Sequence, residues 1–517
     1  MDNSIDRGAD ACCQDPSRTL GMTSPGSDEV RKRRCRASRQ QQSGSHKPGK
    51  ARRYMKRRID EGVYNHRAVV WGKRHKTLNL RRLRIMHRKI STSALIKICT
   101  LALICAFIAA AAFAQELPAA KPESVGVSSE RLERIGAAVQ KSIDEKRIAG
   151  AVTLVARRGR VVWFKPQGMM DREASKAMRP DTMFRICSMT KPITSLAVMM
   201  LYEEGHFLLE DPISKYLPEF KNPKVLVKPE SGSPYTIPAP REITIRDLLR
   251  HTSGLTYQWN DRLGAMYAAA NVGHGLLPYN GTIEDNVKRL AGVPLLFNPG
   301  ERWEYSLGVD VLGRLVEVVS GKPLDEFFRT RIFEPLGMKD TYFYPPENKL
   351  ERLAAAYTYY ADKGLNRFPD TPITEGSFVY SADYPYKGPK KLFAGGAGLT
   401  STAMDYARFC QMMLDGGKAG SMRLLSRKSV ELMTQDQLGK ISPEQGFGLG
   451  FGVEGVKVPL AELGSAGEFS WGGFFYTAFT IDPKEQMVVI FMAQLHPTGD
   501  LSLDREVNAL AYQAIAD

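Results

Sequence analysis

Ser188 and Lys191, in the stretch FRICSMTKPITS (184–195), have the types and spacing of a nucleophile and its base. Residues i and i+3 share a helix face, so the Lys191 amine can reach the Ser188 hydroxyl one turn away. A serine hydroxyl needs a base, and a lysine can serve if burial and neighbouring charge lower its pKa. The alternative is structural: Ser188 caps a helix and Lys191 is a solvated charge. This segment alone slightly favours that alternative.

Pro192 indicates where the helix after Ser188 begins. Proline is tolerated near the first turn of a helix and disfavoured deeper in. Ser188 is therefore expected at the N-terminus of a helix over 189–205 that ends at Gly205. The free N–H groups and the positive end of the helix dipole favour negative charge that develops there.

The segments around this helix predict an α/β fold. Apolar spacing indicates a helix at 132–145, a strand hairpin within 150–168, strands at 446–455, 469–483 and 486–494, and a helix at 501–517. Short helical patterns and Pro/Gly loops fill the middle of the chain. We therefore expect one α/β lobe (about 120–205 and 391–517) and one mainly helical lobe (about 206–390), with the active site between them.

The formal net charge of +16 lies in the N-terminal part of the chain. Residues 1–114 hold 25 Lys/Arg and 8 Asp/Glu, a net of +17, which leaves 47 basic and 48 acidic residues in 115–517. The body therefore has no bias toward polyanions, and we expect no nucleic-acid partner for it. Nucleic-acid binding stays open only for residues 1–85.

Residues 86–114 have the layout of a secretory signal peptide, with a basic start, an apolar run from Ile98 and Ala-Phe-Ala before Gln115. We predict cleavage after Ala114 and a periplasmic or secreted domain (115–517) without a stable membrane partner. The alternative is a retained inner-membrane anchor. Residues 1–85 are too basic and polar to fold alone. Because Met86 offers a start codon, we hypothesise that translation begins there.

Further segments resemble the penicillin-recognising serine hydrolases, in that family's order, and are closest to the class C β-lactamase-like branch. Besides SMTKPITS they are ITIRDLLRHTSGL (243–255), NPGERWEYSLGVDVLG (298–313), FEPLGMKDTYF (333–343) and GGAGLTSTAMDYARF (395–409). The resemblance covers essentially all of 120–517. It implies a β-lactamase/transpeptidase-like fold: an antiparallel sheet flanked by helices, plus a mainly helical lobe.

Two departures from the family motifs resemble the family VIII carboxylesterases. The Tyr-x-Asn motif reads Tyr305-Ser306-Leu307, and the place of Lys-Thr-Gly reads Trp471-Gly472-Gly473. In β-lactamases the motif lysine offers a cation to the substrate carboxylate and the asparagine bonds the side-chain amide. Trp471 and Leu307 can do neither, and they suit an uncharged ester better.

The resemblance implies a serine carboxylesterase for short acyl esters, with an acyl-enzyme on Ser188. Lys191 and Tyr305 would share the proton transfer, and which of them is the formal base stays open. Backbone N–H groups of Ser188 and Phe474 would form the oxyanion hole. The expected pocket residues are Trp471, Gly472, Gly473, Leu307, Tyr257 and Trp259.

No metal and no cofactor is expected, because the sequence has no CxxC, no HExxH and no His/Cys cluster. Cys187 and Cys410 are expected to be buried, and His251 is given no catalytic role. The expected partner is a small-molecule ester. Two alternatives remain: a β-lactamase or D-alanyl-D-alanine peptidase of the same fold, and a non-catalytic module that binds or senses a ligand.

Overall fold

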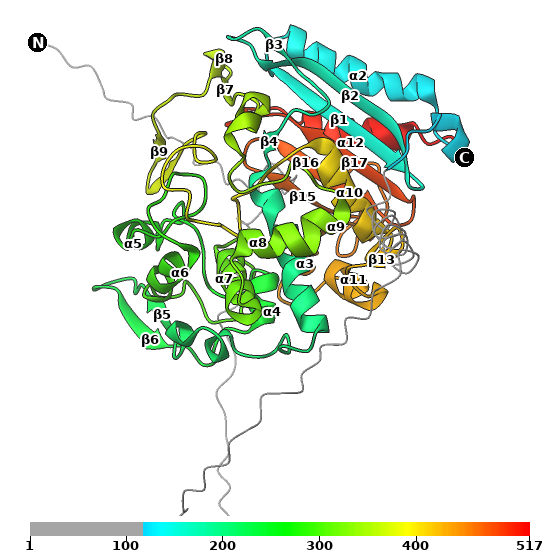
Figure 1. The fold of residues 1–517 in the computed structure, drawn as a ribbon. Coiled ribbons are helices and arrows are strands. Elements are labelled where there is room, and N and C mark those ends of the chain that lie inside the picture. Colours follow the sequence, from blue (N-terminus) through cyan, green and yellow to red (C-terminus); the bar gives the residue numbers. More distant parts are fainter. Residues whose placement is uncertain (1–116) are drawn as a thin grey trace, which may run out of the picture. The chain divides into compact units, whose positions relative to one another are not determined.

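The computed structural model describes residues 117–517, and the predictions for 1–85 and 86–114 lie outside the described residues. Its central sheet is antiparallel, with the strand order β14-β15-β16-β17-β1-β2-β3 (Figure 1). These strands are β1 (Gly150–Arg157), β2 (Arg160–Asp171), β3 (Lys176–Ala177), β14 (Gly452–Val453), β15 (Phe469–Gly473), β16 (Thr477–Asp482) and β17 (Met487–Met492). The predicted α/β fold, with a sheet built from both ends of this region, is confirmed.

Both faces of the sheet are buried, as strand β1 illustrates. Val152 and Leu154 belong to one hydrophobic core, whereas Ala151 and Val155 belong to another. This alternation is the period of two that a strand imposes on its side chains. Helices α2 (Ser129–Asp144) and α12 (Leu503–Gln513) cover one face, and α10 (Ala403–Leu414) packs on the other (Figure 1).

Helix α3 (Thr190–Glu203) is the element that carries Lys191, and every residue from Thr190 to Leu201 is buried. It packs against α7 (Gly308–Ser320), the helix that follows Tyr305. The other helices are α4 (Ile245–Leu249), α5 (Gly264–Ala269), α6 (Ile283–Ala291), α8 (Leu324–Phe328), α9 (Glu334–Leu336) and α11 (Arg427–Thr434). Burial of a helix on all sides fixes its side chains from several directions, which suits a catalytic element.

The stretch 206–390, predicted as mainly helical, also contains three two-stranded hairpins. They are β5 (Lys224–Val227) with β6 (Tyr235–Pro238), β7 (Tyr357–Tyr360) with β8 (Gly364–Arg367), and β9 (Ile373–Glu375) with β10 (Phe378–Tyr380). Two further pairs lie near the sheet: β4 (Phe184–Arg185) with β11 (Thr400–Ser401), and β12 (Lys418–Ala419) with β13 (Met422–Arg423).

The strand predicted at 446–455 is largely wrong, because only β14 pairs there. A Cβ on Gly448 would lie 2.0 Å from the Met433 carbonyl oxygen, and one on Gly450 would lie 2.3 Å from Ser195 Oγ. These glycines form a loop packed closely against its neighbours. The segment 469–483 is two strands, β15 and β16, which a turn at Phe474 joins.

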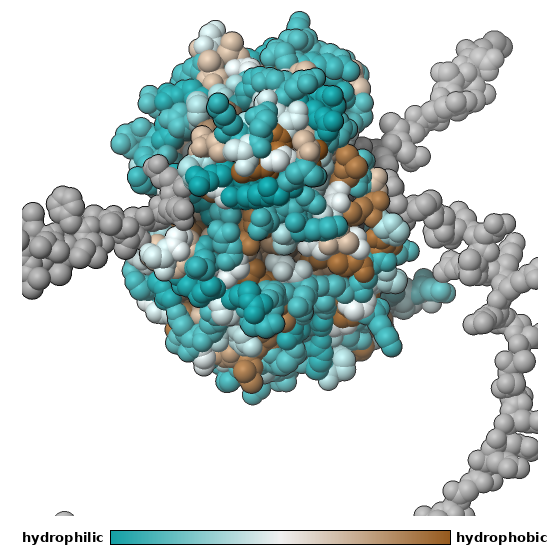
Figure 2. Space-filling model, turned by 90° about the vertical axis from the view of Figure 1, so that its right-hand side faces the viewer, coloured by the Kyte–Doolittle hydropathy of each residue, from teal (hydrophilic) through white to brown (hydrophobic). Residues whose placement is uncertain are grey.

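The face of the molecule shown in Figure 2 is mainly hydrophilic, with apolar residues gathered in small patches. Within residues 117–517, no helix combines the length and the apolar character needed to cross a bilayer.

Candidate active site

Ser188 lies in a 3-10 turn (Cys187–Met189) that leads directly into α3. Cys187, just before it, has a φ of 45°, in the left-handed region that side chains other than glycine rarely adopt. The turn is held in place because Ile186 N–H donates to the Leu399 carbonyl at 3.1 Å. Such backbone strain persists only where the surrounding structure imposes it.

The Lys191 side chain is 1% exposed, and its ammonium has three hydrogen-bond acceptors. Nζ donates to Ser188 Oγ at 3.3 Å, to the Tyr257 hydroxyl at 3.0 Å and to the Gly396 carbonyl at 2.8 Å. An ammonium has three N–H donors, so these contacts use its full capacity. The alternative in which Ser188 caps the helix and Lys191 is a solvated charge is wrong. Lys191 is buried, and the N-cap of α3 is Met189, whose side chain makes no capping hydrogen bond.

Aromatic rings lie close to the Lys191 ammonium. The Tyr305 ring centre lies 4.5 Å from Nζ, within range of a cation–π interaction. Tyr257 stacks on Tyr305 at 5.4 Å and on Trp259 at 4.2 Å, and Trp471 lies 5.6 Å from Tyr305. The structure therefore brings together Ser188, Lys191, Tyr257, Trp259, Tyr305 and Trp471, and we call these six residues the Ser188 cluster.

Tyr257 and Tyr305 meet Lys191 in different ways. Tyr257 accepts a hydrogen bond from Nζ, whereas Tyr305 presents its ring face. Burial raises the pKa of Tyr257 well above its ordinary value, and the neighbouring Tyr305 and Asp310 raise it further. The sequence suggested Tyr257 only as a pocket residue, so its contact with Lys191 was missed.

His251 supports the loop beside Tyr305. Its Nδ1 lies 3.1 Å from Ser306 Oγ, and its ring centre lies 4.9 Å from that of Tyr305. Burial, and then the charge of Lys191, lowers the pKa of His251 well below its ordinary value. The imidazole is therefore neutral, and it contacts Ser306 rather than Ser188.

The end of strand β15 lies directly beside the turn that carries Ser188. A Cβ on Gly473 would sit 2.2 Å from Thr477 Oγ1 and 2.4 Å from the Ile186 carbonyl oxygen. Only glycine fits this approach. Gly472 precedes it on the strand, and Phe474, whose N–H was predicted for the oxyanion hole, follows it at the turn.

Leu307 differs from its prediction as a pocket residue. Its side chain is 0% exposed and belongs to the main hydrophobic core at the start of α7.

Two residues beside Lys191 were missed by the sequence analysis. Gly396 accepts from Nζ although it lies 205 residues along the chain, and Asp310 on α7 accepts from Gly396 N–H at 3.3 Å. The glycines of GGAGL were noticed, but no local pattern pairs them with Lys191.

Within residues 117–517, no group of three or more His, Cys, Asp or Glu side chains could hold a metal ion. Cys187 and Cys410 are buried and unpaired, as expected. Burial raises the pKa of the Cys187 thiol to about 11, so the residue next to Ser188 is not a reactive thiolate.

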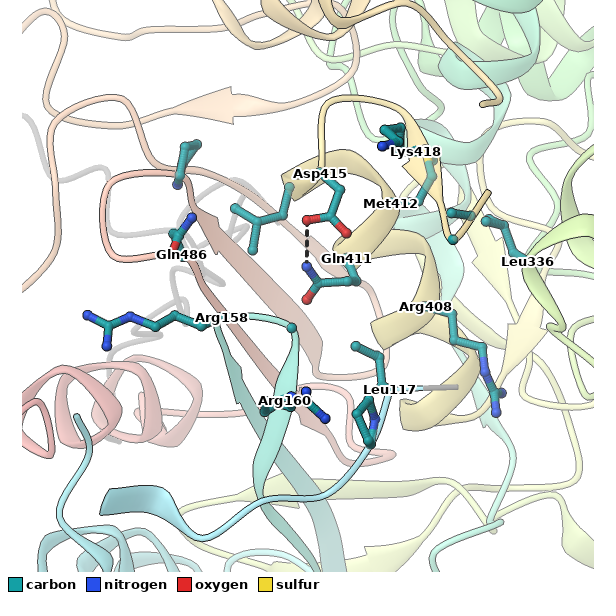
Figure 3. Close-up of a pocket in the computed structure, with 16 residues that line it drawn as sticks. Leu117, Arg158, Arg160, Leu336, Arg408, Gln411, Met412, Asp415, Lys418 and Gln486 are labelled. Carbon is teal, nitrogen blue, oxygen red and sulfur yellow. Dashed lines mark hydrogen bonds between the residues drawn. The ribbon is translucent and has the colours of Figure 1, made fainter. Parts of the chain in front are cut away.

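Two surface cavities lie elsewhere in the described chain. One, of about 360 Å³, is lined by basic side chains such as Arg158, Arg160 and Lys418 (Figure 3). In its lining, Gln411 Nε2 donates a hydrogen bond to Asp415 Oδ1 at 2.9 Å. The other, of about 770 Å³, has an apolar lining that includes Phe333 and Phe393. Neither cavity is lined by a residue of the Ser188 cluster.

Residues 135–513 match the sequence profile of the family described as Beta-lactamase. The chain belongs to this family. Esterase EstB of Burkholderia gladioli is 33% identical over 367 residues, which cover 69% of this chain and 89% of that protein. A putative D-alanyl-D-alanine carboxypeptidase of Salmonella agona is 28% identical over 404 residues, which cover 74% of this chain and 87% of that protein.

Among solved structures, EstCE1, a hydrolase with promiscuous acyltransferase activity, is similar with a TM-score of 0.65 and 29% identity. The match covers 74% of this chain and 99% of that chain. This beta-lactamase-family protein is therefore a serine hydrolase with esterase relatives.

Proposed function

We propose that this protein is a carboxylesterase that hydrolyses short-chain acyl esters through an acyl-enzyme on Ser188. The observation that carries the proposal is the buried Lys191 Nζ, 3.3 Å from Ser188 Oγ. This contact places the Lys191 amine within hydrogen-bond reach of the hydroxyl, where it can take the Ser188 proton once it has lost one of its own. The name of one relative, esterase EstB, supports an ester as the substrate.

The proposed reaction starts from the form of the group Lys191, Tyr257 and Tyr305 that has already lost one proton. Ser188 Oγ attacks the ester carbonyl while its own proton passes to this group. The tetrahedral intermediate collapses, the proton returns to the leaving alkoxide, and an alcohol departs. Water then attacks the acyl-enzyme, and the same group takes one of its protons. The carboxylic acid leaves and the Ser188 hydroxyl is restored.

The oxyanion of each tetrahedral intermediate needs donors that are already in place. Backbone N–H groups of Ser188 and Phe474 are proposed for this role. The close approach of Gly473 to the Ile186 carbonyl supports it, because it brings the Phe474 turn next to Ser188.

The hydrogen bonds of Lys191 support an uncharged substrate. Its three N–H groups are bonded to Ser188, Tyr257 and Gly396, so none is left for a substrate carboxylate. Trp471, where β-lactamases carry a second lysine, adds an apolar surface instead. Aromatic faces favour apolar acyl or alkoxy groups.

The first test compares the purified protein with its Ser188→Ala variant, using a short-chain nitrophenyl ester and a chromogenic cephalosporin. Ester turnover, little cephalosporin turnover and an inactive variant are expected. Equal ester hydrolysis by the variant would remove Ser188 from the mechanism.

A peptidase or β-lactamase activity is the second candidate, and the carboxypeptidase relative favours it. Efficient cephalosporin turnover, or release of D-alanine from a D-alanyl-D-alanine peptide, would put this candidate ahead. Acylation that stops after one equivalent would instead indicate a ligand-sensing module.

Export to the periplasm or the medium is also proposed, and it rests on the signal-like sequence at 86–114. Cleavage there predicts a mature protein that begins at Gln115. N-terminal sequencing of the native protein tests this, and any peptide from residues 1–85 would contradict a start at Met86.

A further inference from the structure

Asp310, on α7, is a buried carboxylate next to the Ser188 cluster that the proposed reaction does not use. It lies five residues after Tyr305, and its side chain is 0% exposed. Oδ1 accepts a hydrogen bond from Gly396 N–H at 3.3 Å. Oδ2 has no hydrogen-bond partner within residues 117–517. Burial of a carboxylate in which one oxygen has no hydrogen-bond partner costs free energy, so a compensating interaction is expected.

Gly396 connects this carboxylate to Lys191. Its N–H donates to Asp310, and its carbonyl oxygen accepts from Lys191 Nζ at 2.8 Å. A Cβ at this position would lie 2.5 Å from Asp310 Oδ2 and 3.4 Å from the Tyr257 hydroxyl. The carboxylate therefore lies against the glycine, on the same side as the tyrosine hydroxyl. A side chain at position 396 would push these groups apart.

The charges around Asp310 supply the compensation. Burial raises the pKa of Asp310 to about 6, and the positive charge of Lys191 works against that rise. Other titratable groups around Lys191 include Tyr257, Tyr305 and His251, and Cys187 lies close enough to sense its charge. Burial favours the uncharged forms of Tyr257, His251 and Cys187. The Asp310 carboxylate is therefore a negative charge close enough to Lys191 to interact with its ammonium.

We propose that Asp310 is a positioning residue: it fixes the Gly396 peptide that holds Lys191 beside Ser188, and its charge balances the Lys191 ammonium. The inference rests on the proposed function, since it assigns Asp310 a role in preparing Ser188 for attack. It adds no chemical step, because Asp310 contacts Gly396 rather than Ser188.

The test uses Asp310→Asn, which keeps an acceptor for Gly396 N–H and removes the charge. Asp504→Asn is the matched control, because burial raises the pKa of Asp504 to about 6 as well, whereas its helix α12 covers the opposite face of the sheet. The rate at which a fluorophosphonate modifies Ser188 is followed by intact mass between pH 5 and 9. The profile of kcat/KM for a nitrophenyl ester is measured in parallel.

Removal of the negative charge makes it easier for Lys191 and its tyrosine partners to lose a proton. We therefore expect the acidic limb of both profiles to move to lower pH by about one unit in Asp310→Asn. The maximal rate should fall at least tenfold because Lys191 is held less firmly. The Asp504→Asn control should keep the wild-type limb even if its melting temperature falls.

If the acidic limb of both pH profiles in a folded Asp310→Asn variant stays where it is in the wild type, the proposal is overturned. If that variant does not fold, Gly396→Ala tests the same connection, and a wild-type labelling rate would equally overturn it. Labelling of Ser188 and hydrolysis of the ester are separate measurements, so the Asp310 proposal and the esterase proposal can be refuted independently. A shifted labelling limb without ester turnover would support the role of Asp310 and refute the esterase proposal, whereas an unreactive wild-type Ser188 would refute both.

Discussion

Lys191 donates a hydrogen bond of 3.0 Å to the hydroxyl of Tyr257, which lies 66 residues further along the chain. Tyr305, the tyrosine that the sequence motif singles out, contacts the same ammonium through its ring face at 4.5 Å. Two tyrosines thus contact one lysine by two different interactions, and substitution can separate them.

Tyr257→Phe should lower kcat/KM for a nitrophenyl ester by about 10²-fold or more, because Lys191 loses one of its three acceptors and the proton group loses a hydroxyl. Steady-state kinetics with Tyr257→Phe and Tyr305→Phe measure the two effects side by side. Tyr305→Phe keeps the ring that faces Lys191, so any loss in that variant reports on its hydroxyl. A loss of less than threefold in Tyr257→Phe would mean that its hydrogen bond has no part in catalysis.

Gly473→Ala should lower kcat/KM by at least 10²-fold, because the new Cβ would collide with the Ile186 carbonyl and Thr477 Oγ1. Displacement of β15 would move the proposed Phe474 donor. Gly292→Ala is a suitable control, since its nearest neighbour would be 3.3 Å away, at the end of α6. Kinetics and circular dichroism of both variants distinguish a misplaced donor from unfolding, and normal activity in Gly473→Ala would contradict the proposed oxyanion site.

Arg185→Met should destabilise the protein by about 3 kcal/mol or more. The guanidinium is buried and donates to the Ala382 and Ala354 carbonyls and to Gln494 Oε1. Its removal takes this donor from both carbonyls, whereas Gln494 Oε1 keeps the hydrogen bond from Arg185 N–H. Urea unfolding monitored by fluorescence measures the loss. Arg160→Met, at an exposed position, should change the free energy of unfolding by less than about 0.5 kcal/mol. Similar values for the two variants would refute the role of Arg185.

Asp247→Asn should destabilise the protein in a pH-dependent way. Burial raises the pKa of Asp247, but hydrogen bonds from Arg241 and Thr244 N–H outweigh it, and the folded pKa lies below its ordinary value. A depressed folded pKa contributes stability above the unfolded pKa of about 4, and this stability is lost as the pH falls through the folded pKa.

The difference between wild type and Asp247→Asn should therefore be about 2 to 4 kcal/mol at pH 7 and shrink below pH 4. Unfolding at pH 7, 5, 4 and 3 measures it, with Asp362→Asn at an exposed position as the control. A difference that stays constant with pH would mean that the carboxylate charge is not what stabilises this site.

Local patterns were enough to predict the hairpin of β1 and β2 and the helix α2, whereas the pairing of Ser188 with Lys191 also needed the resemblance of the other segments to a known family. For the hairpin and the helix the signal lies within one or two turns or strands. The contacts of Lys191 with Tyr257 and Gly396 span 66 and 205 residues, and no local spacing encodes them. The complete burial of Leu307 was not predicted either, since it depends on how the start of α7 packs into the core.

The pairing of β1 with β17 also sets the earliest point at which the sheet of this protein can close. Val152 pairs with Met492, so the sheet cannot close until some 340 further residues have left the ribosome. At about 5–20 residues per second, this is roughly 20–70 s after β1 emerges. Ser188 is made early, but the strand that edges its site arrives near the end of synthesis. A chain truncated before β15 would contain both SMTK and Tyr305 and still lack a working site.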